Sequence, residues 1–477
     1  MREQKMRKIK ALSRLGEDRV EPEGNQGVLG AVAAETERDG GRNLCDEVFS
    51  SENIEQAIYK VRSNKGAAGV DGMTVAELEK WWEEKGADEE HFIRNLHYRP
   101  LPVRKVEIPK SNGGTRALGI PCVKDRMIQQ AVLQVLQPII DPQFSEHSFG
   151  FRPERSAHQA IEQARKYYEE GHTTVVDIDL KRYFDTVNHD ILMDLVERRF
   201  GITDPVVLHI IRRSLMSGIM EGGITSQRTE GTPQGGPLSP LLSNIYLDVF
   251  DRELERRGHA FVRYADDCNI YVKSRRAGER VMETANDFLE KKLRLTVNSE
   301  KSEVGSPSKL KFLGFSLGKD AEGTFIRVHA ASIRRLKDKI RRLTKRNRGI
   351  SLACMLGELR RALTGWINYF GIAKCKGLCE ATDEWLRTRI RQYIWKQWKR
   401  QRTKIRRLRS FGVKIRTSFQ WGLTKRSYWR IANSPVLKTT VTNGYLEKQG
   451  LFSLTKHYTE KCLSKRTAEY RPVRSVV

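Results

Sequence analysis

The spacing of apolar residues predicts alternating helices and strands in the first part of the chain. Between residues 48 and 61 apolar side chains recur at helical spacing, at Val48, Ile54, Ala57, Ile58 and Val61. Residues 103–109 alternate like a strand, and a Ser-Asn-Gly-Gly turn followed by a return strand from residue 116 indicates a β-hairpin. A helix is expected over residues 124–137, ending at Pro138.

The middle of the chain continues the mixed pattern. Residues 174–180 predict a strand, and residues 189–200 a helix that begins after Asn188 and ends at Gly201. A helix over 241–256, a hairpin centred on Ala265-Asp266-Asp267 and a helix over 277–293 follow, and LKFLGFSL near residue 315 indicates strands. Strands and helices mixed up to about residue 318 favour an α+β sheet domain.

The composition changes after this domain. Residues 330–409 read as helical and basic, and between 385 and 409 there are eleven Lys or Arg and no acidic residue. Four aromatic residues are interleaved with these charges, namely Trp385, Tyr393, Trp395 and Trp398. Residues 410–477 have shorter elements and stay basic, whereas residues 1–45 are polar and Gly/Glu-rich and read as a flexible arm.

The charge balance points to a polyanionic partner. The 477 residues hold 86 Lys and Arg against 59 Asp and Glu, a formal net charge of +27, which favours nucleic acid binding. Seven scattered cysteines are typical of a reducing compartment rather than a disulfide framework. No apolar run approaches the roughly 20 residues that a membrane helix needs, so no membrane partner is expected.

Two groups of carboxylates suggest metal-dependent chemistry. Strand periodicity puts Asp177 and Asp179 on one face, and Asp266 and Asp267 stand at the tip of an apolar hairpin. Mg²⁺ prefers carboxylate oxygens, and phosphoryl transfer needs neutralised charge on the attacking and leaving oxygens. An isolated Tyr-Ala-Asp-Asp is more often ordinary turn chemistry, but an Asp-bearing strand followed by a paired-Asp hairpin indicates the metal site of a palm polymerase.

Long segments in a fixed order carry a more specific resemblance. They are NKGAAGVDG (64–72), IPKSNGGTRALGIPCVKDRMIQQAV (108–132), FSEHSFGFRPERSAHQAI (144–161), DIDLKRYFDTVNHD (177–190), GTPQGGPLSPLLSNIYL (231–247) and RYADDCNIY (263–271). From about residue 50 to 318 the chain resembles the reverse transcriptases of group II introns. Further on, GWINYFG (365–371) resembles the maturase, or thumb, domain of this family.

The resemblance implies an α+β right-hand polymerase with fingers and palm, followed by an α-helical thumb and a small basic DNA-binding region. The expected divisions are a flexible extension (1–45), fingers and palm (46–318), a thumb with three parallel helices (330–400) and a basic tail (401–477). It also implies an RNA-directed DNA polymerase that promotes splicing and homing of its intron.

The resemblance assigns roles position by position. Asp179, Asp266 and Asp267 are expected to be catalytic and to hold two Mg²⁺ ions, with Asp177 as a neighbour rather than a ligand. The residues expected to bind the dNTP are Lys110, Arg116, Phe184 and Gln234, with the ring of Phe184 excluding a 2′-OH. Without the resemblance, a core aromatic would explain Phe184 equally well, and a solvated hairpin rim would explain the two basic residues.

Template and intron RNA contacts are expected elsewhere. The residues expected to make them are Arg152, Gly235, Arg387, Arg391, Lys399 and Arg406. A run of charges is usually a solvated helix face, but eleven like charges without an acid favour a phosphate backbone partner. Residues 425–454 resemble a DNA-binding tail. Only Cys375 and Cys379 form a close cysteine pair, so no zinc-bearing HNH nuclease domain is expected, and the cDNA primer would come from another source, such as a nascent replication strand.

Two other functions remain open. One is an RNA-binding splicing factor with a decayed polymerase, which the presence of all three carboxylates disfavours. The other is a domesticated reverse transcriptase in phage defence or repair, which would share every catalytic residue. The expected partners are group II intron RNA, target DNA and dNTPs in a bacterial cytoplasm, with the protein associated with the nucleoid or a ribonucleoprotein. The oligomeric state stays open, with a homodimer as one candidate.

Overall fold

The computed structural model describes residues 43–477 apart from 110–114, 222–223, 227, 234 and 470–477. The chain divides into two units, of which only Asn43 and Leu44 are described in the first (1–44), and the account below concerns the second (45–477). None of the helices in the described ranges is long and apolar enough to cross a membrane.

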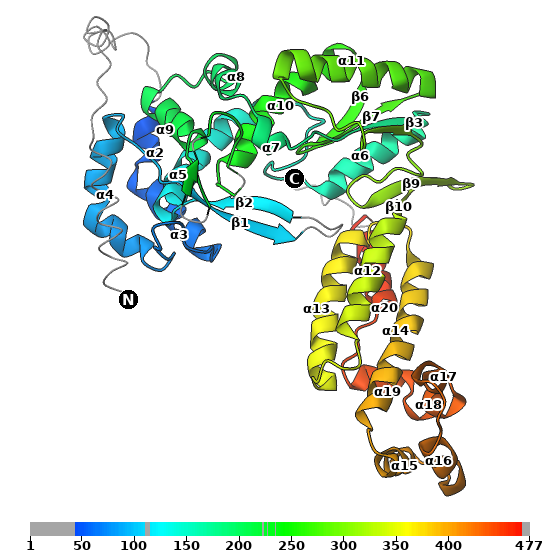
Figure 1. The fold of residues 1–477 in the computed structure, drawn as a ribbon. Helices are drawn as coiled ribbons and strands as arrows, with labels where there is room; N and C mark the ends of the chain where they lie inside the picture. The colour runs from blue at the N-terminus through cyan, green and yellow to red at the C-terminus, as the bar shows by residue number, and fades with distance from the viewer. Residues whose placement is uncertain (1–42, 110–114, 222–223, 227, 234, 470–477) are drawn as a thin grey trace, which may run out of the picture. The chain divides into compact units, whose positions relative to one another are not determined.

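The N-terminal part of this unit is a helical layer around a hairpin (Figure 1). Its elements are α2 (Leu44–Val48), α3 (Ser51–Ser63), α4 (Leu78–Arg94), β1 (Val103–Pro109), β2 (Thr115–Ile120), α5 (Val123–Ile140) and a 3₁₀ turn (Asp141–Gln143). The apolar stripe predicted for α3 is confirmed, because Ile54, Ala57, Ile58 and Val61 are buried. Helix α5 does not end at Pro138 as predicted; a proline in the last turn removes a single backbone donor, and the helix continues to Ile140.

The hairpin is antiparallel, with Ile108 opposite Arg116, and it belongs to a four-stranded sheet of order β2-β1-β4-β5. Strands β4 (Ile219–Glu221) and β5 (Ile224–Ser226) follow α9 (Pro205–Leu215) in the chain. Strand β4 pairs with β1 in parallel through Val103 and Ile219. This pairing joins the predicted finger hairpin to a segment that lies more than a hundred residues later in the sequence.

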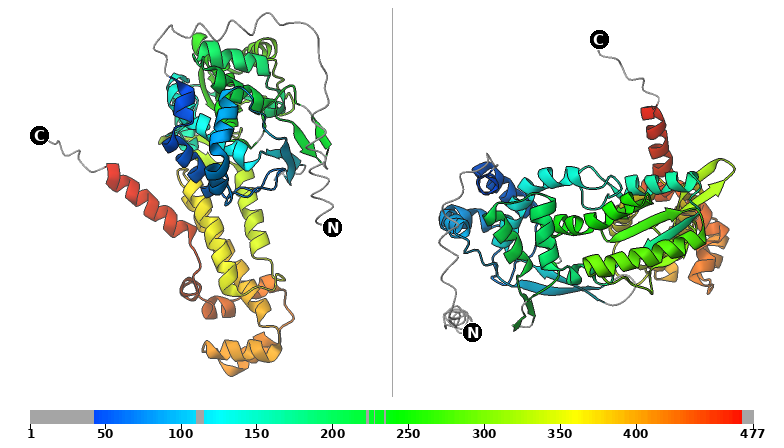
Figure 2. Two further views of the ribbon diagram at one scale, coloured as in Figure 1. Left: turned by 90° about the vertical axis from the view of Figure 1, so that its left-hand side faces the viewer. Right: turned by 90° about the horizontal axis from the view of Figure 1, so that it is seen from above.

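A second four-stranded sheet, of order β6-β7-β3-β8, carries the acidic segments. Its strands are β3 (Thr174–Ile178), β6 (Ala260–Tyr264), β7 (Asp267–Val272) and β8 (Glu303–Gly305). Helix α11 (Arg275–Leu293) lies along one face, as Figures 1 and 2 show, and Gly278 brings it close to Thr174 and Val176. Helix α6 (Ala157–Glu169) packs on the other face, in a cluster with Val175 and Tyr271.

The elements between the two sheets complete this part of the molecule. They are α7 (Tyr183–Thr186), α8 (His189–Asp194), a π-helical turn (Leu195–Arg199) and α10 (Ser239–Arg256). Asn188 caps α8 as predicted, because its side chain accepts from the backbone N–H groups of Asp190 and Ile191. The predicted strand 174–180 ends at Ile178, and of LKFLGFSL only the last residues are extended, since Leu313 and Gly314 both have positive φ.

The C-terminal part is helical. It begins after the β9 (Phe315–Asp320) and β10 (Gly323–Val328) hairpin with α12 (Ala330–Leu343), α13 (Leu352–Phe370) and α14 (Lys376–Gln397). Six shorter or later helices follow, namely α15 (Gln401–Ser410), α16 (Ile415–Gly422), α17 (Tyr428–Ala432), α18 (Pro435–Thr440), α19 (Asn443–Lys448) and α20 (Leu454–Glu469). Helix α20 packs on α13 and α14 and adds a fourth helix to the predicted three.

One hydrophobic cluster spans the predicted division at residue 400. Leu363 and Leu386 from the long helices share it with Leu437 and Leu446 from the tail. The same cluster reaches α6, and His158 of α6 lies 2.7 Å from the carbonyl oxygen of Tyr369. The division at residue 400 therefore stays a prediction about roles, since the packing is continuous across it.

Candidate polymerase active site

The sheet brings the two acidic segments together. Strands β3 and β7 are antiparallel, with Asp177 opposite Asn269 and Ile178 opposite Cys268, so the next residues along this register are Asp179 and Asp267. Strand β7 is also paired with β6, where Tyr264 lies opposite Asp267. The carboxylates at 179, 266 and 267 therefore gather at one end of the sheet, where the ladder stops.

Burial and nearby negative charge raise the pKa of two carboxylates in this region, Asp177 and Asp267. Burial, together with the negative charges of Asp177 and Asp266, raises the pKa of Asp267 to about 8. Burial also raises the pKa of Asp177 to about 6, although the Asn269 amide donates to its carboxylate at 2.7 Å and opposes the shift. A cation at this end of the sheet would relieve both shifts, because it stabilises the ionised carboxylates.

Asp179 already has cationic and amide partners. Its Oδ2 accepts from Nδ2 of Asn298 at 3.0 Å and from Nζ of Lys301 at 3.1 Å. Within the described residues, no group of three or more His, Cys, Asp or Glu side chains is arranged closely enough to hold a metal ion. The donor set itself suits Mg²⁺, because each of the three candidates offers carboxylate oxygens and Asp266 is exposed.

The turn that carries Asp266 has an unusual backbone. Ala265 has a φ of 59°, in the left-handed region that a non-glycine residue seldom adopts, and it is 6% exposed. Gly150 approaches it so closely that a Cβ there would lie 2.2 Å from the Ala265 nitrogen. Residues 149–151 therefore pack tightly against the turn formed by residues 265–267, called the acidic turn below. This close packing explains the glycine at position 150.

Phe184 also lies next to the segment that begins at Gly231, called the Gln-Gly segment below. The backbone N–H of Thr232 donates to the carbonyl of Phe184 at 2.6 Å, and Gly231 donates to Val187. The Phe184 side chain is partly exposed and its ring meets that of Tyr183 edge-on, with centroids 5.2 Å apart. Gly235, at a φ of 128°, lies against the backbone of Gly119 in β2, so this segment touches the hairpin that precedes it.

Two of the predicted nucleotide contacts lie outside the described residues, and the side chain of a third is not described. Lys110 and Gln234 are among the residues that the structure does not describe, and only the backbone of Arg116, in β2, is described. Their roles stay predictions that rest on the resemblance. The two strands of the predicted hairpin are confirmed, and Arg116 is the second residue of β2.

The prediction that Arg152 contacts the template is wrong. Its side chain is 3% exposed and all its donors are used within the protein. Nε and Nη2 bind the Asp141 carboxylate and Nη2 also donates to the Asp141 carbonyl, while Nη1 donates to the carbonyls of Ser145 and Ser148. Arg152 instead fastens the segment before α6 to the end of α5.

The basic helix α14 is also less exposed than its charge run suggested. Arg391 is buried, with Nε donating to the Val441 carbonyl at 2.9 Å and Nη2 to the Asn443 side chain at 3.0 Å, so its assignment as an RNA contact is wrong. Arg387 is half-buried. Lys399 and Arg406 are exposed, at the end of α14 and on α15, and remain available to a phosphate backbone.

Comparison with known proteins decides the family. A reverse transcriptase (RNA-dependent DNA polymerase) family model matches residues 108–317, and a group II intron maturase-specific domain model matches residues 333–412. The chain belongs to the group II intron reverse transcriptase and maturase family. The first of these domains makes it an RNA-directed DNA polymerase by class, and the second implies nucleic acid partners.

The chain is also similar to individual named proteins. Protein YkfC of Escherichia coli is 36% identical over 54% of this chain and 77% of its own length. The group II intron-encoded protein LtrA of Lactococcus lactis is 29% identical over 60% of this chain, but the chain spans only 58% of LtrA. A solved partial Cas6-RT-Cas1–Cas2 complex is 26% identical over 53% of this chain and 43% of that chain, with a TM-score of 0.35.

A cavity lined by basic side chains lies between the reverse transcriptase domain and helices α12 and α13. It measures about 590 Å³ and lies beside Asp267. Its charged lining comes from the palm and from helices α12 and α13, at Lys311, Arg335, Lys339 and Arg361. Four basic side chains around one cavity favour an anionic ligand, such as a phosphate backbone.

Sequence reasoning missed the residues beneath the acidic turn. Arg263 is buried there, and its side chain bonds to the buried side chains of Asp251, Asn244 and Ser148. One signal was available, because Arg263 interrupts the otherwise apolar strand FVRY. A charged residue within a buried strand requires a partner, and that requirement could have directed attention to it.

Proposed function

We propose that this chain copies RNA into DNA at Asp179, Asp266 and Asp267 and that it also binds the RNA of its own group II intron. The observation that carries the first part is the convergence of the three carboxylates at one end of the sheet. Asp179, Asp266 and Asp267 would hold two Mg²⁺ ions. When bound, such ions neutralise charge on the attacking and leaving oxygens of a phosphoryl transfer.

The chain's own residues supply position and selection. The primer 3′-OH attacks the α-phosphate of a dNTP and pyrophosphate leaves, with the reacting groups aligned between the hairpin and the palm sheet. Phe184, whose carbonyl is bonded to Thr232 of the Gln-Gly segment, would pack against the sugar and exclude a 2′-OH. Lys110, Arg116 and Gln234 would contact the nucleotide, and Gly235 the template.

RNA binding is assigned to the exposed basic residues of the C-terminal helices. Arg387, Lys399 and Arg406 are the members of the predicted set that the structure leaves half-buried or exposed. Phosphate contacts of this kind release counterions and give a salt-dependent affinity. The tail (401–477) would contact target DNA, so that the bound ribonucleoprotein splices its intron and later inserts it in a bacterial cytoplasm.

A primer-extension assay tests the proposal. A poly(rA) template with an oligo(dT) primer, Mg²⁺ and labelled dTTP is offered to the wild type and to Asp266→Ala, and binding of intron RNA is measured for both. Extension by the wild type alone, with equal RNA binding, is the expected result. No extension by a folded, RNA-binding wild type would favour the splicing factor, and loss of RNA binding in Asp266→Ala would contradict the separation of the two roles.

A further inference from the structure

Arg263 is a fully buried charge beneath the acidic turn. It lies in β6, its side chain is 1% exposed, and it forms an ion pair with Asp251 of α10, which is 0% exposed. Nε donates to the Asp251 carboxylate at 2.7 Å and Nη2 donates to it at 2.6 Å. Burying an ion pair costs desolvation free energy. The other contacts of Arg263 therefore indicate its role.

The other donors of Arg263 reach the catalytic turn and its surroundings. Nη1 donates to the carbonyl of Ala265 at 2.9 Å and to the side-chain oxygen of Asn244 at 3.0 Å. Nη2 also donates to the Ser148 hydroxyl at 2.8 Å. All five N–H donors of the guanidinium are therefore satisfied, in a fork that a lysine ammonium could not reproduce.

The contact with Ala265 bears on backbone strain. A left-handed conformation is unfavourable for a residue with a Cβ, which then lies too close to the following carbonyl oxygen. Such a conformation persists only where surrounding groups fix it. The Arg263 guanidinium holds the carbonyl of the strained residue, and the next two residues are Asp266 and Asp267.

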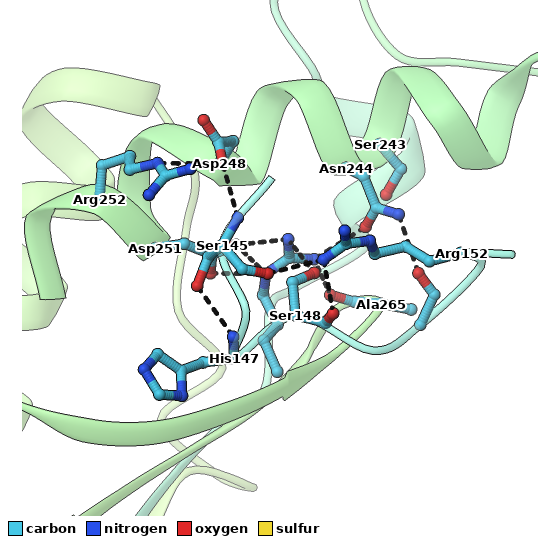
Figure 3. Close-up of polar contacts among 12 residues, drawn as sticks. Ser145, His147, Ser148, Arg152, Ser243, Asn244, Asp248, Asp251, Arg252 and Ala265 are labelled. Atoms are coloured by element: carbon cyan, nitrogen blue, oxygen red, sulfur yellow. Dashed lines mark hydrogen bonds and ion pairs between the residues drawn. The ribbon is translucent and has the colours of Figure 1, made fainter. Parts of the chain in front are cut away.

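The same guanidinium also holds in place the segment around Gly150, which packs against the acidic turn. Figure 3 shows Ser148, Asn244 and Ala265 gathered in one polar cluster. Asn244, which accepts from Arg263, donates to the carbonyl of Gly150 at 2.8 Å. Backbone bonds between Arg263 and residues 147 and 149 hold this segment beside β6, and Gly150 touches the Ala265 backbone.

We propose that Arg263 is a positioning residue that fixes the acidic turn, so that Asp266 and Asp267 face Asp179 in the arrangement that DNA synthesis requires. This inference rests on the proposed polymerase function. Arg263 is buried beneath the turn. It acts directly on the Ala265 carbonyl and, through Asn244, on the carbonyl of Gly150. A small displacement of either carboxylate would lower the rate, because catalytic groups must be held within a fraction of an ångström.

The test compares two conservative substitutions. Arg263→Lys keeps a charge for Asp251 but loses the fork that reaches Ala265. Arg94→Lys is the control, because the Arg94 guanidinium also pairs with carboxylates, at Asp46 and Glu90, and joins α4 to α2 rather than contacting the acidic turn or the segment around Gly150. Primer extension is measured well below the melting temperature of each full-length variant, and binding of Mn²⁺ alone is followed by electron paramagnetic resonance.

The expected result is that both variants melt at lower temperature but only Arg263→Lys loses kcat, by about 100-fold. Its Mn²⁺ affinity should fall as well, while Arg94→Lys stays close to the wild type in both readouts. Equal kcat and equal Mn²⁺ affinity in the two variants would overturn the proposal and leave Arg263 with a structural role only.

Gly150→Ala tests the same turn from its other side if Arg263→Lys does not fold. The added methyl would meet the Ala265 nitrogen, whereas Gly377→Ala, in α14, meets nothing within 4 Å and is the control. Loss of kcat and Mn²⁺ affinity in Gly150→Ala alone supports the proposal, and no difference from Gly377→Ala overturns it. If the wild type itself makes no DNA, the proposed function fails, and the Mn²⁺ comparison still decides whether the turn is positioned in this way.

Discussion

The acidic end of the palm sheet and the basic helix α14 both gather like charges, yet the fold treats them differently. In the sheet, Asp179, Asp266 and Asp267 come from two segments and converge where the strand ladder ends. In α14, successive arginines turn through about 100° per residue and point to different neighbours. Arg389 donates to Thr344 and lies over Trp385, while Arg391 is buried against Val441 and Asn443.

The difference lies in what surrounds each charge. Helix α14 is covered by α17 and α20, and backbone carbonyls and side-chain oxygens accept its buried guanidinium groups. The carboxylates find amide donors at Asp177 and Asp179, but burial and repulsion leave Asp267 with a raised pKa. Arg391 therefore has its acceptors within the protein, whereas the raised pKa of Asp267 is one that a bound cation would lower.

The largest effect on DNA synthesis is expected at Asp179, with a substitution of its neighbour Asp177 as the comparison. Asp179→Asn should reduce DNA synthesis by about 1000-fold, because one of the converging carboxylates is lost. Asp177→Asn should keep most of the activity, since Asn269 can still donate to the remaining side-chain oxygen. Primer extension on poly(rA) with oligo(dT) measures both, and equal losses would make Asp177 a participant.

A smaller effect is expected at Phe184. Phe184→Ala should lower the preference for dTTP over UTP on poly(rA) by roughly 10–200-fold, because the pocket would no longer reject the 2′-OH by its shape. Tyr183→Phe is the control, as it keeps the neighbouring ring and removes only a hydroxyl that donates to Ser243. Unchanged selectivity in Phe184→Ala would return this ring to a packing role.

Arg391 should matter for stability rather than for RNA. Arg391→Met is expected to lower the free energy of unfolding by about 2 kcal/mol, because the Val441 carbonyl loses its buried charged donor. Thermal melting measures this change, and Arg402→Met, at an exposed position on α15, should melt close to the wild type. A weaker salt dependence of RNA binding in Arg391→Met than in the wild type would show that Arg391 contacts RNA after all.

The smallest effect is expected at the exposed end of the basic run. Replacing Lys399 and Arg406 by Ala should reduce the slope of log affinity against log salt by about one for each phosphate that the variant no longer binds. Filter binding of intron RNA over a salt series measures the slope, with melting temperature as the folding control. A slope equal to that of the wild type would identify these side chains as a solvated face.

The sequence by itself predicted much of the secondary structure and the acidic set. The segment TVVDIDL predicted strand β3, the apolar hairpin around FVRY predicted β6, and Asn188 predicted the start of α8. These features are local, because strand period, helix period and capping depend on neighbouring residues. The order of long segments predicted the family, which the two domain models and the similarity to YkfC then showed.

Only the tertiary structure decided which charges are buried. Arg152 and Arg391 look like exposed cations in the sequence, but Asp141, Val441 and Asn443, which lie 11, 50 and 52 residues away, enclose them. Arg263 looked incidental until the fold placed Asn244 and Ala265 around its guanidinium. The physical reason is that a charge leaves water only when groups distant in the chain supply its hydrogen bonds, and local sequence does not specify those groups.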